Sequence, residues 1–466
     1  MATLVMKFGG SLTADPRHIN RVAQVIMAES LAWDHMLVVI SAMAGTTDAL
    51  NRAVEFAAAR DAAGYRAIVA ALREKHLAAV EALLESEPLR RDLIDRIDRL
   101  LFDVLAVCDQ VMVRREALPQ DRDAAMSAGE RMMVEILSAL VRLEGLNTAT
   151  VDAASLIVTD ERHLSATPLV DKIDERVEQV IRPLLEAGIV PLVTGFIGAA
   201  RTGTITTLGR GGSDYTATLL AASLHADEVW MWTSVDGVMS ADPALVPGSR
   251  VIPELSYDEV GELSYFGAHI LHPRAVEPLL TEGIPLRVRN PFNMDHAGTL
   301  IQAEQSETGT NLKAVTAVDG VCISTDNLSI ELGELLEQVR RLVGRIVMNP
   351  VIVIQSYQHL MLVLVVPTSE GPLAAENAAQ RLNAGLRAEN WQVRAVKVIA
   401  AMGMTTQAAA PELVLDNIQP IASAVGPDNR LLLAVNPADV QSAVRQLHKL
   451  TNQPAQITPR GSWATR

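Results

Sequence analysis

The amino-acid sequence predicts an α/β layered domain followed by two small α+β modules. Up to about residue 305, apolar runs of strand length alternate with segments of helical periodicity, and glycine-rich segments follow several of these runs. After residue 305, short apolar strands combine with single helices in two similar units. The chain has 466 residues, of which 49% are hydrophobic and 20% charged. At roughly 150 residues per domain, this length suggests about three folded domains.

The chain opens with a strand, a small-residue loop and a helix. Residues 3–8 are an apolar run interrupted by Lys7, and the glycine pair 9–10 follows at once. The Asp-Pro pair at 15–16 predicts a helix start, because aspartate caps free amides and proline suits the first helical position. A second strand is predicted over 36–40, and it leads into another loop of small residues.

Residues 50–145 have a helical period. Their clearest apolar stripe is formed by Leu93, Ile97, Leu100, Leu101 and Val104. Further strands are predicted over 148–151, 189–194 and 228–232. These strands provide a second α/β half of the same domain.

The second part of the chain predicts two α+β modules, with helices at 332–344 and 438–449. The uncharged run 346–369 has a polar centre, so it predicts two strands around a turn and not a membrane span. The predicted domain boundaries are 1–305, 306–391 and 392–455, followed by a frayed tail at 456–466.

Charge and cysteine content restrict the class of protein. The net charge of −15 and the pI near 5.2 disfavour general binding to nucleic acid or to an anionic membrane. The chain begins without the basic and apolar stretches of a signal peptide. Cys108 and Cys322 lie far apart and form no metal-binding motif. We therefore expect a cytoplasmic protein in a reducing compartment.

The first candidate functional segment is Lys7–Ser11. Glycines after a strand let backbone amides approach a phosphate, and a lysine at the strand end adds a positive charge. An ordinary strand-to-helix turn with a solvated lysine is the alternative. The P-loop and Rossmann fingerprints do not occur in the sequence.

The second candidate segment is Thr207–Asp214. Arg210 is suited to bidentate binding of a carboxylate, and Gly211 and Gly212 allow close backbone approach. Ser213 or Asp214 is expected to cap the following helix. A plain capped turn is the alternative, but the glycine pair makes it costly in backbone entropy.

Two further features, Glu130 and the pair His269 and His272, give less specific signals. Glu130 begins a helix and is suited to binding an ammonium group, although glutamate is common in a first helical turn. His269 and His272 have the i, i+3 spacing of metal ligands on a helix, but neither a third ligand nor an HExxH motif supports a metal site. We therefore expect no resident metal centre.

Taken together, these segments resemble the aspartate kinases of the amino-acid kinase family, and the resemblance covers the whole chain. The matching motifs are Lys7–Gly10, Ser41–Asp48, Gly129–Arg131, Thr194–Gly198, Gly203–Asp214, Val235–Val238 and Phe266–Pro273. The resemblance implies a three-layer carbamate-kinase-like domain followed by ACT (ferredoxin-like) regulatory domains. The helical region at about 50–145 would cover the amino-acid pocket.

The family resemblance implies phosphorylation of the L-aspartate side chain by ATP with Mg²⁺, as the first step towards aspartate-derived amino acids. It assigns catalysis to Lys7 and Asp214. It implies substrate binding by Ser41, Thr47, Glu130, Arg210, Ser213 and Asp214. It implies nucleotide binding by Lys7, Phe8, Gly9, Gly10, Thr233, Ser234, Met239, Ala244, His269 and Ile270. It also implies an amino-acid effector at the ACT modules. We expect a homodimer or larger homo-oligomer, because the exposed sheet edges of these modules need partners.

The departures from the family pattern lie mainly on the nucleotide side. Ser234 replaces an aspartate, Met239 a tyrosine, Ala244 an arginine and His269 a lysine, and Ser11-Leu12 stands where Thr-Ser is usual. Histidine is mostly neutral at pH 7 and is a weaker phosphate partner than lysine. We therefore predict an active kinase with weaker ATP binding or relaxed nucleotide choice.

Two alternatives stay open. The first is a catalytically impaired, aspartate-binding regulatory subunit of the same fold, which retention of Lys7 and Asp214 disfavours. The second is a kinase for another carboxylate or for carbamate, which Arg210 and Glu130 disfavour because they suit an α-amino acid. The turn at 324–330 has no glycine where ACT ligand sites usually have one, so feedback inhibition is a weaker expectation.

Overall fold

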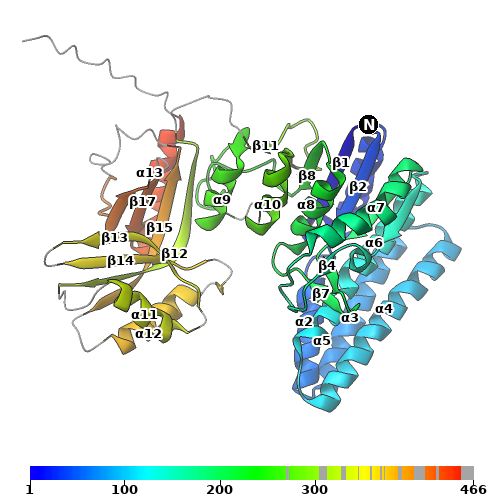
Figure 1. Ribbon diagram of the computed structural model, residues 1–466, viewed down its shortest axis with the longest axis horizontal. Coiled ribbons are helices and arrows are strands. Elements are labelled where there is room, and N and C mark those ends of the chain that lie inside the picture. The colour runs from blue at the N-terminus through cyan, green and yellow to red at the C-terminus, as the bar shows by residue number, and fades with distance from the viewer. Residues whose placement is uncertain are drawn as a thin grey trace, which may run out of the picture. The chain divides into compact units, whose positions relative to one another are not determined.

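The computed structural model describes residues 1–268, 271, 273–303, 312–326, 332–344, 346–356, 359–367, 370–371, 373–386, 391–403, 415–426 and 430–452. The chain forms two compact units (Figure 1). The first unit comprises residues 1–238, 253–257 and 271–304, and the second comprises 239–252, 258–270 and 305–466.

In the described part of the first unit, eight strands form one sheet in the order β3-β5-β2-β1-β8-β10-β11-β9. They are β1 (Thr3–Phe8), β2 (His35–Ile40), β3 (Thr148–Val151), β5 (Val190–Thr194), β8 (Glu228–Trp232), β9 (Glu254–Ser256), β10 (Leu286–Arg289) and β11 (Thr299–Gln302). Neighbouring strands from β3 to β10 are parallel, and β11 is antiparallel to β10. The five strands predicted in this unit are confirmed, with ends within one residue.

Helices cover both faces of this sheet (Figure 1). One face packs against α1 (Pro16–Glu29) and α6 (Ala128–Leu143). The other face packs against α7 (Val170–Glu186) and α8 (Gly212–Leu224), and α10 (Pro273–Glu282) packs against α8. The first unit is therefore a three-layer α/β fold, as predicted.

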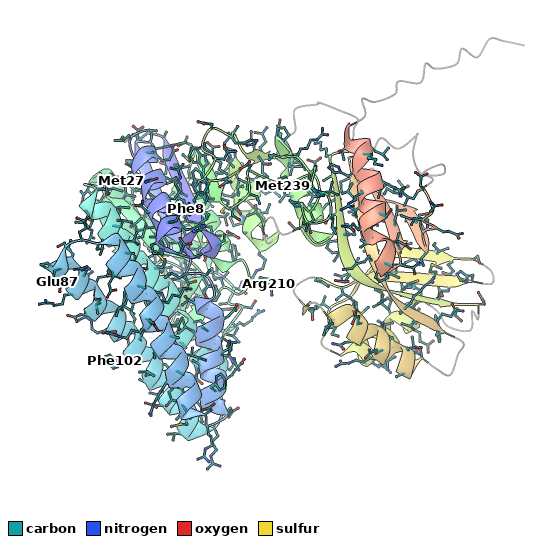
Figure 2. All side chains as sticks on the ribbon, turned by 180° about the vertical axis from the view of Figure 1, so that it is seen from behind. Phe8, Met27, Glu87, Phe102, Arg210 and Met239 are labelled. Carbon is teal, nitrogen blue, oxygen red and sulfur yellow. The ribbon has the colours of Figure 1, made fainter. Side chains whose placement is uncertain are left out.

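Four further helices extend the layer that contains α1 and α6. They are α2 (Thr46–Ala58), α3 (Ala62–Leu83), α4 (Glu87–Arg114) and α5 (Pro119–Met126). The predicted stripe on α4 is buried at Leu93, Ile97, Leu101 and Val104. Phe102 points away from the core and is 67% exposed (Figure 2). The helical period predicted for 50–145 is thus confirmed.

The alternation of β1 decides which way Lys7 points. Leu4, Met6 and Phe8 belong to the core on the α1 and α6 side of the sheet. Successive side chains of a strand point to opposite faces, so Val5 and Lys7 face the α8 side. Lys7 is therefore placed on the face where α8 begins.

A small sheet lies beside the main one in the first unit. Its strands are β4 (Val158–Thr159), β6 (Ile197–Ala200) and β7 (Ile205–Thr207), in the order β4-β6-β7. Sequence analysis did not predict these short strands. β7 leads directly into the glycine-rich segment before α8.

In the second unit, six described strands form one antiparallel sheet in the order β13-β14-β12-β15-β17-β16. They are β12 (Ala314–Thr325), β13 (Asn349–Gln355), β14 (Leu360–Val365), β15 (Gln392–Met402), β16 (Ala422–Val425) and β17 (Leu431–Val435). The helices α11 (Leu332–Val343), α12 (Ala374–Gly385) and α13 (Val440–Lys449) accompany them. The strand pair expected within 346–369 is β13 and β14, and both expected helices are present.

Two long strands run through both halves of this sheet. β12 pairs with β15 over residues 314–324, nearly its whole length, and β14 pairs only with residues 320–325 of β12. β17 pairs with residues 397–401 of β15. One half thus has the order β-α-β-β-α-β in the chain and β13-β14-β12-β15 in the sheet, a ferredoxin-like arrangement. The two halves share strands β12 and β15, so they form one continuous sheet.

The two faces of the six-stranded sheet have separate cores. Val321 and Ile323 pack under α11 and α12, and Val315 packs under α13. The opposite face packs against Phe266, which directly follows α9 (Tyr257–Tyr265). Among the described residues, no helix has the length and apolar character that a membrane span requires.

Candidate active site

A cavity of about 350 Å³ lies in the first unit, where β1 and β2 reach their carboxyl ends. Ligands of open parallel sheets commonly bind at this edge. The cavity is lined by Lys7, Gly10, Ser41, Ala42, Met43, Ala44, Gly45, Thr47, Asp48, Glu130, Phe196, Gly209, Arg210, Gly211, Gly212, Ser213 and Asp214.

Three helices begin at this cavity. Thr47, Glu130 and Ser213 lie in the first turns of α2, α6 and α8, respectively. The free amides and the positive dipole end of a helix N-terminus favour anions. Lys7 and Arg210 add two cationic side chains. The cavity is therefore built to hold negative charge.

Lys7 and Asp214 form an ion pair inside the cavity. Lys7 Nζ lies 2.6 Å from Asp214 Oδ1, and the two side chains are 13% and 19% exposed. The strand alternation of β1 points Lys7 toward α8, and Asp214 is in the first turn of that helix. The pair holds the lysine ammonium at a fixed place on the cavity wall.

The structure corrects one sequence prediction at α8. Neither Ser213 nor Asp214 caps the helix, because the N-cap residue is Gly211, in the left-handed conformation at φ 72°, and no side chain caps the helix. Asp214 instead pairs with Lys7. The local sequence of the turn favours a cap, and only the family resemblance linked Asp214 to Lys7, which lies 207 residues away on β1.

Close packing positions the loop before α8. A Cβ at Gly212 would lie 2.7 Å from the Phe196 ring, and one at Gly195 would lie 2.5 Å from Ser213 Oγ. Phe196 itself has a φ of 69°, a region that bulky side chains rarely adopt. Its amide donates to Thr216 Oγ1, and its carbonyl accepts from the amide of Leu208. This strained residue supports the loop from one side.

Glu130 is the most deeply buried carboxylate among the described residues that line the cavity. Its side chain is 3% exposed. Oε1 accepts a hydrogen bond from the Ala42 amide at 3.3 Å, and Oε2 is buried without a hydrogen-bond partner among the described residues. Burial raises the pKa of Glu130 to about 8. A buried acceptor without a donor is costly, so Glu130 is suited to receive a cationic group from a ligand.

The loop that follows β2 contacts Glu130 and also lines the cavity. Thr13 Oγ1 donates to the Ala42 carbonyl at 3.0 Å. Lys75 Nζ on α3 donates to the Ala44 carbonyl, and burial lowers the pKa of this lysine. Gly45 has a φ of 75° and begins α2. Two long-range hydrogen bonds thus hold the backbone of this loop.

The cavity brings together most of the predicted substrate and catalytic residues. These are Lys7, Ser41, Thr47, Glu130, Arg210, Ser213 and Asp214, with Gly10 from the predicted nucleotide set. Gly9 adjoins the site, since a Cβ there would lie 3.3 Å from Lys7 Nζ. The Phe8 side chain is buried and stacks on Trp232, so only the backbone of Phe8 is available to a ligand.

Four other predicted nucleotide residues, Thr233, Ser234, Met239 and Ala244, are not among the described residues that line this cavity. Thr233 and Ser234 follow β8 in the first unit, and Met239 and Ala244 belong to the second unit. His269 and Ile270 lie outside the described residues. In the part of the chain that the structure describes, no group of three or more His, Cys, Asp or Glu side chains forms a metal site.

Three cavity features escaped sequence analysis. Phe196 and Asp48 lie within motifs that were recognised, but neither was selected as a site residue. Lys75 supports the loop after β2 from α3, and the scarcity of lysine in this chain is the signal that marks it. The positive φ of Phe196 and its contact with Gly212 leave no pattern in the local sequence. The role of Phe196 can therefore be seen only in the structure.

Comparison with known proteins identifies the family. The model of the amino acid kinase family matches residues 2–290. Bifunctional aspartokinase/homoserine dehydrogenase 2 of Arabidopsis thaliana is 33% identical over 337 residues, which are 70% of this chain and 35% of the relative. Aspartokinase 3 of Arabidopsis thaliana is 33% identical over 303 residues, which are 64% of this chain and 53% of the relative. The chain thus spans about a third to a half of the length of these relatives.

Solved structures agree over nearly the whole chain. E. coli aspartokinase III in complex with aspartate and ADP is 25% identical with a TM-score of 0.77, covering 97% of this chain and all of that one. The same E. coli enzyme in complex with lysine and aspartate is 26% identical with a TM-score of 0.80 and the same coverage of this chain. Since the family model spans well over half of the sequence, the chain belongs to the amino acid kinase family.

Proposed function

We propose that the protein is an aspartate kinase, which transfers the γ-phosphoryl group of ATP to the side-chain carboxylate of L-aspartate and forms 4-phospho-L-aspartate. The observation that carries this proposal is the composition of the cavity. Three helix N-termini, Lys7 and Arg210 favour anions, whereas the buried Glu130 favours one cationic group. An amino acid with a second carboxylate has this distribution of charge.

Arg210 and Glu130 are proposed to bind the substrate backbone. The Arg210 guanidinium would bind the α-carboxylate, and the unpartnered Oε2 of Glu130 would accept a hydrogen bond from the α-ammonium. Ser41, Thr47 and Ser213 line the same cavity and would supply further hydrogen bonds. The solved E. coli relative binds aspartate, which supports this assignment.

Lys7 and Asp214 are proposed to act on the phosphoryl group. The substrate carboxylate is already ionised and nucleophilic, so the transfer needs no strong general base. Lys7, oriented by Asp214, would stabilise negative charge on the phosphoryl oxygens, and the Gly9 and Gly10 amides would bind phosphate. Catalysis then rests on positioning and on charge stabilisation.

Mg²⁺ is proposed to enter as part of the MgATP substrate, where it neutralises charge on the phosphates. The carboxylates of Asp48 and Asp214 line the cavity, and carboxylate oxygens suit this ion. For the nucleotide base and sugar we retain Thr233, Ser234, Met239, Ala244, His269 and Ile270 as candidates. The departures at four of these positions support weaker or less selective use of ATP.

The second unit is proposed to be a pair of ACT modules that dimerises and binds an amino-acid effector. Its ferredoxin-like strand order supports this, as does the complex of the E. coli relative with lysine. The sheet ends in β13 and β16, and such edges favour pairing with another chain. Cys108 and Cys322 are buried free thiols, which agrees with a cytoplasmic location.

The test is a hydroxamate assay with MgATP, L-aspartate and hydroxylamine, which converts an acyl phosphate into a coloured product. Colour that requires both substrates and disappears in Lys7→Ala would support the kinase. No colour, combined with aspartate binding in calorimetry, would favour the regulatory subunit instead. Aspartate that neither reacts nor binds would overturn the proposed function.

A further inference from the structure

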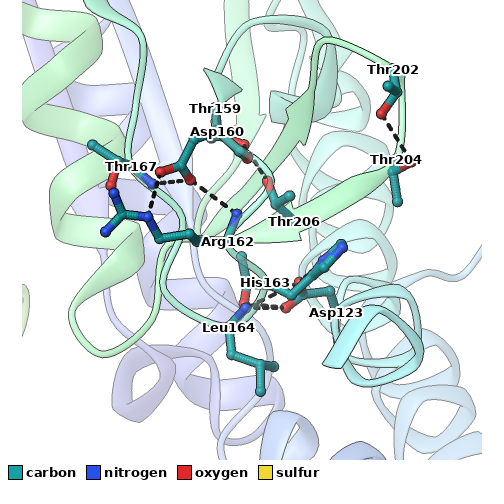
Figure 3. A network of polar contacts seen from close by, with 11 residues as sticks. Asp123, Thr159, Asp160, Arg162, His163, Leu164, Thr167, Thr202, Thr204 and Thr206 are labelled. Atoms are coloured by element: carbon teal, nitrogen blue, oxygen red, sulfur yellow. Dashed lines mark hydrogen bonds and ion pairs between the residues drawn. The ribbon is translucent and has the colours of Figure 1, made fainter. Parts of the chain in front are cut away.

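A buried carboxylate outside the cavity connects its two substrate-binding walls. The Asp123 side chain on α5 has no exposed surface. Its Oδ1 accepts from Thr207 Oγ1 at 2.6 Å, and its Oδ2 pairs with His163 Nδ1 at 2.7 Å. The Leu164 amide donates to the same carboxylate (Figure 3). Burial raises the pKa of Asp123, and these hydrogen bonds oppose that shift.

The elements that meet at Asp123 lead to the two proposed ligands of the substrate backbone. α5 continues through Ser127 into α6, where Glu130 follows Asp123 by seven residues. Thr207 ends β7, and Arg210 follows it by three residues. The Asp123 carboxylate therefore connects two segments of the cavity lining, which are the start of α6 with Glu130 and the loop after β7 with Arg210.

The third segment that contacts Asp123 is the loop 160–167, whose two ends are joined by hydrogen bonds. The Asp160 amide donates to the Thr167 carbonyl, and the Thr167 amide donates to Asp160 Oδ1, both at 2.9 Å (Figure 3). At the tip, Leu164 has a φ of 67°. The Leu164 carbonyl packs closely on Gly209, since a Cβ at Gly209 would lie 3.0 Å from the Leu164 carbonyl oxygen. The loop that Asp123 and His163 hold thus supports the residue next to Arg210.

We propose that Asp123 and His163 are positioning residues for aspartate, which set the separation of Arg210 from Glu130 without touching the substrate. The inference rests on the proposed function, because it assumes that these two residues bind the α-carboxylate and the α-ammonium. Loss of the network frees the Arg210 loop from the start of α6. The affinity for aspartate then falls, whereas Lys7 and its partner Asp214 on α8 keep their contact.

The test compares the same substitution at adjacent residues of β7. Thr207→Val keeps the side-chain shape and removes the hydrogen bond to Asp123. Thr206→Val removes a buried hydroxyl that pairs with Thr159 at 2.8 Å, on the other face of the strand. Both variants lose one buried hydrogen bond, so comparable losses in Tm are expected. Only Thr207→Val is expected to raise the KM for aspartate, by about tenfold or more.

Conservative variants separate positioning from simple destabilisation. Thr207→Ser and His163→Gln each restore a donor to Asp123 and are expected to keep the KM for aspartate within about threefold of the wild type. His163→Leu removes the donor and is expected to resemble Thr207→Val, with an unchanged KM for MgATP. Equal KM values for aspartate in Thr207→Val and Thr206→Val would overturn this inference but would leave the proposed function intact. A wild type that neither phosphorylates nor binds aspartate overturns it together with the proposed function.

Discussion

The Lys7 ammonium lies 2.6 Å from the Asp214 carboxylate, although the two residues are separated by most of the kinase-family region. The end of β1 and the first turn of α8 meet at this ion pair. The pair leaves Lys7 fixed at the cavity wall, where the proposed phosphoryl transfer would need positive charge.

Replacing Lys7 by methionine is expected to lower kcat by about a thousandfold or more, because the variant loses the charge that stabilises the phosphoryl oxygens. Its affinity for aspartate, measured by calorimetry, is expected to change little, since Arg210 and Glu130 are intact. Asp214→Asn is expected to reduce kcat less, because the lysine charge remains but is no longer held. Unchanged turnover in Lys7→Met would contradict the assigned role.

Aspartate binding is expected to depend on pH through Glu130. The pKa of this carboxyl is about 8 in the free protein. Only the ionised form attracts the substrate ammonium, so affinity should rise roughly tenfold per pH unit below 8 and level off above it. Calorimetry in buffers of different ionisation enthalpy should show proton release at pH 7. A Glu130→Gln variant that retained this pH dependence would rule out Glu130 as its source.

The same carboxyl should lower the stability of the ligand-free protein at alkaline pH. The folded-state pKa of Glu130 is raised from 4.5 to about 8, so its contribution to stability is full below pH 4.5 and is lost as pH rises through 8. Glu130→Gln is therefore expected to raise Tm relative to the wild type at pH 9 but not at pH 5. Thermal unfolding without ligand at both pH values provides the measurement.

Gly195 is expected to be intolerant of a side chain. A Cβ there would lie 2.6 Å from Ser213 Cβ and 3.0 Å from its Cα, so the start of α8 would have to move. Gly195→Ala is expected to cost about 1–3 kcal/mol and to raise the KM for aspartate. Gly261→Ala in α9 is the control, since a Cβ there meets nothing within 4 Å and alanine favours helix by up to about 1 kcal/mol. Equal stabilities of the two variants would contradict this packing argument.

His269 carries the prediction that concerns the nucleotide. The residue lies outside the described part of the structure, so the prediction rests on the family resemblance, in which a lysine is usual here. His269→Lys is expected to lower the KM for MgATP several-fold and to leave the KM for aspartate unchanged, because lysine carries a full charge at pH 7. Steady-state kinetics with ATP and GTP measure both affinity and nucleotide choice. An ordinary ATP constant that the substitution leaves unchanged would refute the idea.

Local sequence signals predicted the secondary structure around the site well. The apolar run of β1 and its two glycines, and the Asp-Pro start of α1, depend on residues close together in the chain. Asp15 accepts from the His18 amide, as a capping residue does. The stripe on α4 and the strand pair β13–β14 follow from the same short-range periodicity.

The remaining features depend on contacts between distant segments. The cap of α8 was predicted wrongly because Asp214 has a better partner in Lys7 than in its own backbone. Sequence analysis predicts two C-terminal modules, and only the structure shows that β12 and β15 pair along their length in one sheet. Pairing between strands so far apart in the chain cannot be predicted from the local sequence, since the intervening residues do not determine the register of the two strands.

By itself, the sequence determined the layered fold class and the residues that can hold charge at the ends of β1 and β7, because hydrophobic period and glycine placement act over a few residues. The tertiary structure alone decided that Glu130 loses its contact with water and that Asp123 joins two walls of the cavity. Burial and convergent hydrogen bonding depend on how distant segments pack, and that packing gives these two carboxylates different roles.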